Sequence, residues 1–65
     1  MSFERDIPAL KKALYDTEDR IRKLEEHRDS AKRQLGSGNA DTISRLERNL
    51  EKLEQRRRLI LKELQ

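Results

Sequence analysis

Residues 43–64 read ISRLERNLEKLEQRRRLILKEL. One series of residues in this stretch is spaced by steps that alternate between three and four. Its members are Ile43, Leu46, Leu50, Leu53, Arg57, Ile60 and Leu64. These steps join the a and d positions of a heptad repeat, which lie on one face of a helix that packs against another helix. The stretch therefore predicts a long helix with one narrow apolar face.

The same spacing occurs in the first half of the chain, at Phe3, Ile7, Leu10, Leu14, Thr17, Ile21, Leu24, Arg28, Ala31 and Leu35. We call the two series together the ladder. Gly36-Ser37-Gly38-Asn39 separates them and is typical of a turn. The sequence thus predicts an all-α fold: an antiparallel two-helix hairpin (a coiled coil) in one domain, residues 1–65, with a helix at about 8–35, a turn at 36–39 and a helix at about 40–64. We expect two hairpins to associate into a four-helix bundle dimer.

Local signals define the predicted helix ends. Proline has a fixed φ and no N–H, which suits a first helical turn, so Pro8 is expected to be the first helical residue. Gly36 is expected to cap the first helix in the left-handed conformation. Asn39 or Asp41 is expected to cap the second helix, and Asp41 also places negative charge in its first turn.

Composition narrows the class of protein. Charged residues make up 45% of the chain and apolar ones 32%, which would favour disorder if the apolar residues were not periodic. The absence of cysteine excludes disulfides and thiolate metal sites. No apolar run is longer than the three residues Leu59-Ile60-Leu61, and the first residues lack the apolar core of a secretory signal. We therefore expect a soluble, cytoplasmic protein without membrane contact.

Apolar residues are in surplus where the predicted helices have their free ends, which we call the open end. Folding the chain at the turn pairs residues whose numbers sum to about 78, so the first residues of the chain overhang the second helix. One facing helix covers only about two positions in seven, fewer than are apolar here. We expect the open end to contact a second copy, as a homodimer, or a helix of another protein, through Phe3, Ile7, Leu10, Leu14, Leu59, Leu61 and Leu64. The alternative is a monomer with frayed tips.

Two arginines interrupt the ladder. A charge on a helix seam is costly unless it is paired. In the predicted register Arg28 lies one turn from Glu54 and Arg57 one turn from Glu25, so the four residues can form one alternating cluster that fixes register and orientation. The alternative is a recognition site for an acidic ligand. Thr17 is a milder interruption, because its hydroxyl can bond to its own helix backbone.

No catalytic, cofactor-binding or metal site is predicted. His27 is the single histidine, and no set of ligands converges with it in the sequence. Gly36-Ser37-Gly38 is too short to cradle a phosphate. A two-helix rod also lacks a concave pocket for acid–base chemistry. We therefore expect a non-catalytic interaction or assembly module without cofactor or small-molecule substrate.

The back of the second helix is mostly basic. Its possible contacts to phosphate or to an acidic partner are Arg45, Arg48, Lys52 and Lys62. A small nucleic-acid-binding bundle is therefore the alternative function, although no aromatic residue accompanies the stripe for base stacking. Such a hairpin is similar in architecture alone to the Rop family of plasmid RNA-binding proteins, to hairpin co-chaperones of type III secretion and to coiled-coil arms of some tRNA synthetases. A further interpretation is a designed or excised coiled-coil segment. The irregular charge pattern and the off-register Leu59 argue against an idealised design.

Overall fold

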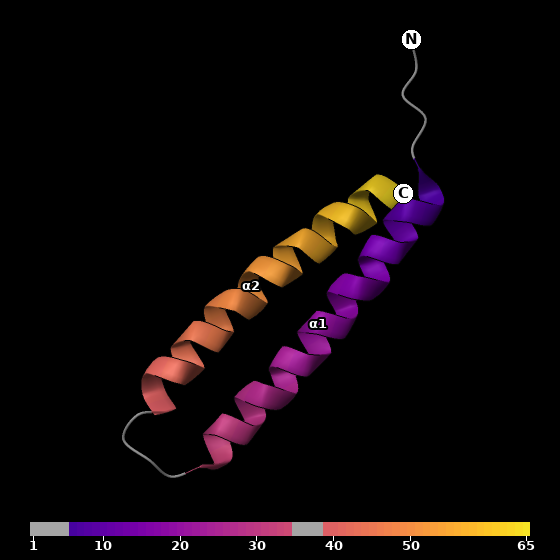
Figure 1. Cartoon of the computed structure of the whole chain (residues 1–65). Helices are drawn as coiled ribbons and strands as arrows, with labels where there is room; N and C mark the ends of the chain where they lie inside the picture. The colour runs from indigo at the N-terminus through magenta and orange to yellow at the C-terminus, as the bar shows by residue number, and fades with distance from the viewer. Residues whose placement is uncertain (1–5, 35–38) are drawn as a thin grey trace.

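The computed structural model describes residues 6–34 and 39–65. Within these ranges it contains two helices, α1 (Ile7–Arg33) and α2 (Asn39–Leu64), and no strand. The helices pack against each other in opposite directions, so that the first turns of α1 lie beside the last turns of α2 (Figure 1). The predicted all-α hairpin is confirmed.

The first turn of α1 is held by its N-cap. The side chain of Asp6 accepts a hydrogen bond from the backbone N–H of Ala9, at 3.1 Å, and Pro8 lies inside the first turn. A capping carboxylate satisfies one of the N–H groups that the start of a helix leaves without a partner. The helix therefore begins at Ile7, one residue before the predicted start.

The turn region differs from the sequence prediction. α1 ends at Arg33 rather than near Leu35, because Gln34 adopts an extended backbone with φ −83° and ψ 129°. The predicted glycine cap at Gly36 lies outside the described residues. Asp41 lies in the first turn of α2, as predicted. A carboxylate there stabilises the helix, because it lies near the positive end of the helix dipole.

Asn39 has a role that the sequence analysis did not assign. Its side-chain amide donates hydrogen bonds to the backbone oxygens of Ala31, at 3.1 Å, and of Gln34, at 2.7 Å. The last carbonyls of a helix lack intrahelical donors, and an amide NH₂ supplies two. Asn39 thus caps the end of α1 from the first turn of α2, a contact that ties the two helices together next to the turn.

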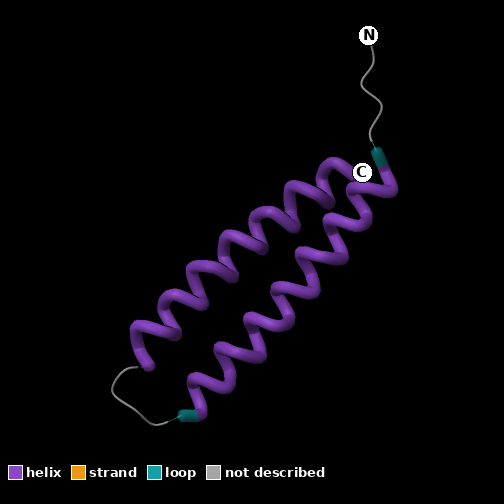
Figure 2. Tube along the Cα trace, in the orientation of Figure 1, coloured by secondary structure: helices purple, strands orange, loops and turns teal. Residues whose placement is uncertain are grey.

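The core is a single seam between the helices. The six buried side chains of the described residues all belong to the ladder, and they are Thr17, Ile21, Ala31, Leu46, Leu50 and Ile60. The Cα atoms extend over 56 × 16 × 13 Å, so the rod is one helix thick and its outer faces lie in solvent (Figure 2). The hydroxyl of Thr17 donates to the backbone oxygen of Ala13 at 2.7 Å, as predicted, which satisfies this buried polar group.

Candidate functional site

The large apolar side chains that the described residues expose lie toward the open end. Among the described residues, the exposed large apolar side chains are Ile7, Tyr15 and Leu59, at 37%, 73% and 65% exposure. All three belong to the first turns of α1 or the last turns of α2, which lie side by side (Figure 1). The predicted contact residues Leu10, Leu14, Leu61 and Leu64 are half-buried there, and Phe3 lies outside the described residues.

Tyr15 was not included in the predicted contact set. It follows Leu14 directly and lies off the ladder, as do Leu59 and Leu61, which the predicted set contains. Tyr15 lines a shallow surface hollow together with Glu18, Asp19 and Arg22. Leu59 lines another hollow, together with Gln55, Arg58 and Lys62. Tyr15 and Leu59, the two most exposed of these three side chains, thus lie in separate hollows near the open end, beside the half-buried leucines of the seam.

The arginines of the seam have partners other than those predicted. Nε of Arg57 lies 3.1 Å from Oε2 of Glu18 across the helix interface, where Glu25 was expected. Glu18 and Glu25 are one heptad apart on the same flank of α1, so spacing alone allows either carboxylate. The pair is about 40% exposed (42% and 43%), which limits its contribution to roughly 0–1 kcal/mol.

Arg28 is paired within its own helix. Its Nε lies 3.3 Å from Oδ1 of Asp29, the next residue, so the guanidinium need not cross the interface to find a carboxylate. Arg28 nevertheless lines one hollow with Glu54, its predicted neighbour, together with Glu47, Leu50 and Glu51. Within the described ranges, no ion pair joins Glu25, Arg28, Glu54 and Arg57 to one another. The alternating cluster predicted from the sequence is therefore replaced by pairs to Glu18 and Asp29.

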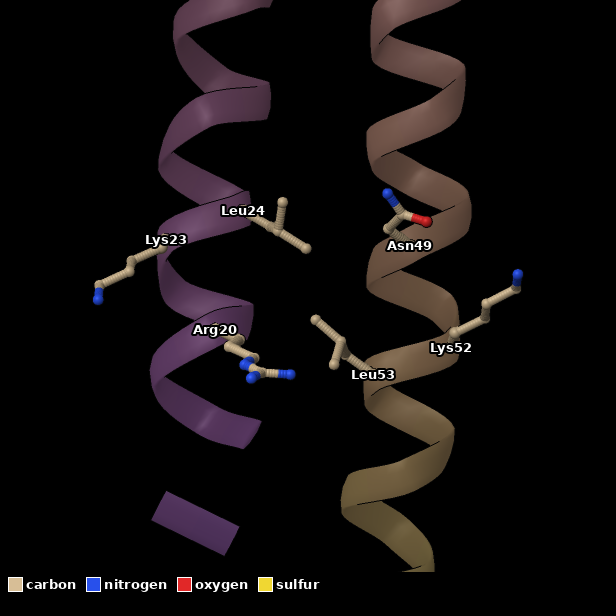
Figure 3. A pocket seen from close by; sticks show the side chains of 6 residues that line it. All are labelled: Arg20, Lys23, Leu24, Asn49, Lys52 and Leu53. Carbon is tan, nitrogen blue, oxygen red and sulfur yellow. The ribbon is translucent and has the colours of Figure 1, made fainter. Parts of the chain in front are cut away.

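A groove lies over the other flank of the seam, with a volume of about 500 Å³. We call it the basic groove, and its lining residues are Arg20, Lys23, Leu24, Asn49, Lys52 and Leu53 (Figure 3). Leu24 and Leu53, which the predicted register pairs, point toward each other and form its floor. Arg20 extends over the gap, whereas Lys23 and Lys52 extend outward on opposite sides.

Opposite charges line the two flanks of the hairpin. The basic groove contains three cations and no carboxylate, whereas the hollow beside Arg28 contains Glu47, Glu51 and Glu54. Successive helical residues turn by about 100°, so Lys52 and Glu54 face away from each other. Lys32 contacts the acidic flank, with Nζ 3.8 Å from Oε2 of Glu47.

Of the four predicted phosphate or acidic-partner contacts, the structure places only Lys52 in the basic groove. Arg45 and Arg48 are exposed on α2, and Lys62 lies in the hollow of Leu59. The cations of α1 were not predicted as part of this set, because the back of α1 taken alone is mixed in charge. The predicted register contains the information that was not used, since the pairing of Leu24 with Leu53 places Arg20, Lys23 and Lys52 around one groove.

The cations of the basic groove differ in their pairing. Nζ of Lys23 lies 3.0 Å from Oδ2 of Asp19, whose other oxygen accepts from Arg22 at 2.6 Å. The hydrogen bond from Lys23 is the main cause that lowers the pKa of Asp19 below its usual value, with Arg22 adding to it. Within the described residues, neither Arg20 nor Lys52 has an ion-pair partner. These two cations are therefore available to an external carboxylate.

Two further features concern chemistry and membranes. His27 is exposed on α1, and no three His, Asp or Glu side chains of residues 6–34 and 39–65 converge as metal ligands. Neither α1 nor α2 has a stretch that is apolar enough over a sufficient length to cross a bilayer.

Comparison with known proteins finds no matching family model, curated protein or solved structure.

Proposed function

We propose that this protein is a non-catalytic protein–protein interaction module that self-associates through its open end, so that two hairpins form a four-helix bundle. The observation that supports the proposal is the position of its exposed apolar side chains. Ile7, Tyr15 and Leu59, the large apolar residues that α1 and α2 leave exposed, all lie near the open end. A second hairpin docked there would cover them.

The incomplete burial of the seam between the helices supports the same proposal. No described side chain is completely shielded from solvent, even at the six buried ladder positions. Burial is worth about 25 cal/mol per Å² of apolar surface, so covering several half-exposed leucines contributes several kcal/mol. A small domain has a total stability of only about 3–5 kcal/mol, and association therefore changes its stability substantially.

Sedimentation equilibrium over a range of concentrations tests this proposal. We expect the wild type to be dimeric at about 100 μM, a concentration at which dimers of micromolar affinity are populated. Leu59→Glu is expected to be monomeric and still helical, because Leu59 is 65% exposed in the hairpin and the added charge must be desolvated in the dimer.

Ser44→Glu is the matched control, since it adds the same charge at an exposed position near the other end of the rod. This variant is expected to dimerise like the wild type. A wild type that stays monomeric at high micromolar concentration and unfolds cooperatively would contradict self-association. Equal loss of the dimer in both variants would place the contact elsewhere.

A further inference from the structure

The basic groove is separate from the open-end contact and has a chemistry of its own. We propose that it binds an amphipathic helix of a partner protein, one that has an apolar stripe flanked by carboxylates. The floor of the groove receives the stripe, and its cationic rim receives the carboxylates. The residues that carry the contact are Arg20, Lys23, Leu24, Lys52 and Leu53.

The apolar floor favours a helix as the occupant. Leu24 and Leu53 face each other across the seam but are only half-buried, so part of each side chain stays open to the groove (Figure 3). A helix laid along two others packs its side chains between theirs at an interaxial distance of about 8–10 Å. An apolar stripe on a third helix would therefore cover these leucines along the length of the rod.

The positive charge of the groove's rim determines which charges the partner helix needs beside its apolar stripe. Arg20 and Lys52 have no ion-pair partner among the described residues, and no carboxylate lines the groove. The adjoining hollow shares Arg20 and adds Arg56, with Asp16 as its one acid. Complementary potentials select partners at such surfaces, so carboxylates beside the stripe match this rim.

A nucleic acid fits the groove less well. Proteins that bind single strands combine cations with aromatic side chains on which bases stack, and no aromatic residue lines this groove. A phosphate backbone also leaves the leucine floor uncovered. The ammonium groups of Lys23 and Lys52 extend outward on opposite sides of the gap (Figure 3), so they border the groove and leave its leucine floor open to an apolar stripe.

The experiment uses a fluorescein-labelled peptide of three heptads with leucine at a and d and glutamate at e and g. Glutamates at these flanking positions repel one another and keep the peptide from pairing with itself. Its affinity for the full chain is measured by fluorescence anisotropy at physiological salt. We expect Arg20→Glu/Lys52→Glu to weaken binding at least about tenfold, because two attractive contacts become repulsive.

Lys12→Glu/Arg48→Glu is the control of equal net charge, since both residues are exposed and neither lines the groove. It is expected to change the affinity less than about threefold, because exposed charges far from the contact are screened. A matched peptide with lysine at e and g is expected not to bind. Circular dichroism of each variant checks that the hairpin remains folded.

Several outcomes would overturn the proposal: no binding of the glutamate peptide, equal weakening by both double variants, or binding of the lysine peptide that Arg20→Glu/Lys52→Glu weakens. A fluorescein-labelled single-stranded oligonucleotide is titrated in parallel, and binding of this polyanion that Arg20→Glu/Lys52→Glu weakens, without binding of the peptide, would also reject a helical partner. Repeating the titration with Leu59→Glu separates this surface from the open end. Loss of self-association in that variant is expected to leave peptide binding unchanged.

Discussion

Replacing Leu50 with alanine is expected to lower the free energy of unfolding by about 2–4 kcal/mol, which is most of the stability of a hairpin this small. Leu50 is the least exposed apolar residue of the seam, at 5%. Removing its side chain loses the free energy gained when that side chain is buried. It also leaves a cavity that two rigid helices cannot fill completely. Urea denaturation followed by circular dichroism measures the loss.

Leu53→Ala is the matched control for Leu50→Ala. It removes the same side chain from the same helix, one ladder step further on, at a position that is only half-buried. The loss of stability is expected to be about half as large, because less apolar surface leaves solvent when Leu53 folds. An equal or larger loss at Leu53 would contradict a seam centred on Leu50.

Glutamate at position 60 is expected to unfold the hairpin, whereas glutamate at position 59 is not. Ile60 is 8% exposed and Leu59 65%, although the two residues are adjacent and both apolar. A carboxylate at position 60 would be buried without a positively charged partner that evolved to pair with it. The cost is several kcal/mol, which is comparable to the total stability. The mean helicity from circular dichroism at low micromolar concentration distinguishes the two variants.

Leu61→Glu completes this comparison, because Leu61 is half-buried and follows the same run. Its effect on helicity is expected to lie between those of the other two variants. If Leu59→Glu unfolded the monomer and Ile60→Glu did not, the orientation of α2 about its axis would be wrong. Low concentration matters here, since dimer formation would otherwise add to the apparent stability.

The fold was predictable because its main determinant is periodic. Within residues 6–34 and 39–65, every buried residue, from Thr17 to Ile60, occupies a ladder position, and a spacing of three and four residues is a property of the sequence alone. The end of α1 was not predicted to the residue. The capping of α1 by Asn39 depends on a side chain from the next helix, and helix-end rules that use neighbouring residues do not contain that information.

The candidate interaction surfaces were predictable in part. The apolar surplus near Ile7 and Leu59 followed from counting apolar residues against the capacity of one seam. The pairing of Arg57 with Glu18 did not follow, because two carboxylates one heptad apart satisfy the same spacing. The basic groove combines Arg20 with Lys52, and it becomes visible only when the two helices are placed side by side.

Contact between open ends is tested most directly by a distance between two copies of the chain. The protein contains no cysteine, so a single introduced cysteine carries one spin label per chain, and any dipolar distance is then intermolecular. Lys12→Cys places the label near the open end and Ser44→Cys places it near the turn, both at exposed positions. Double electron–electron resonance measures each distance distribution.

Association through the open end predicts a defined and shorter distance between labels at position 12 than between labels at position 44. It also predicts that Leu59→Glu abolishes both distances. The absence of any intermolecular distance in the wild type, or a shorter distance between labels at position 44, would contradict it.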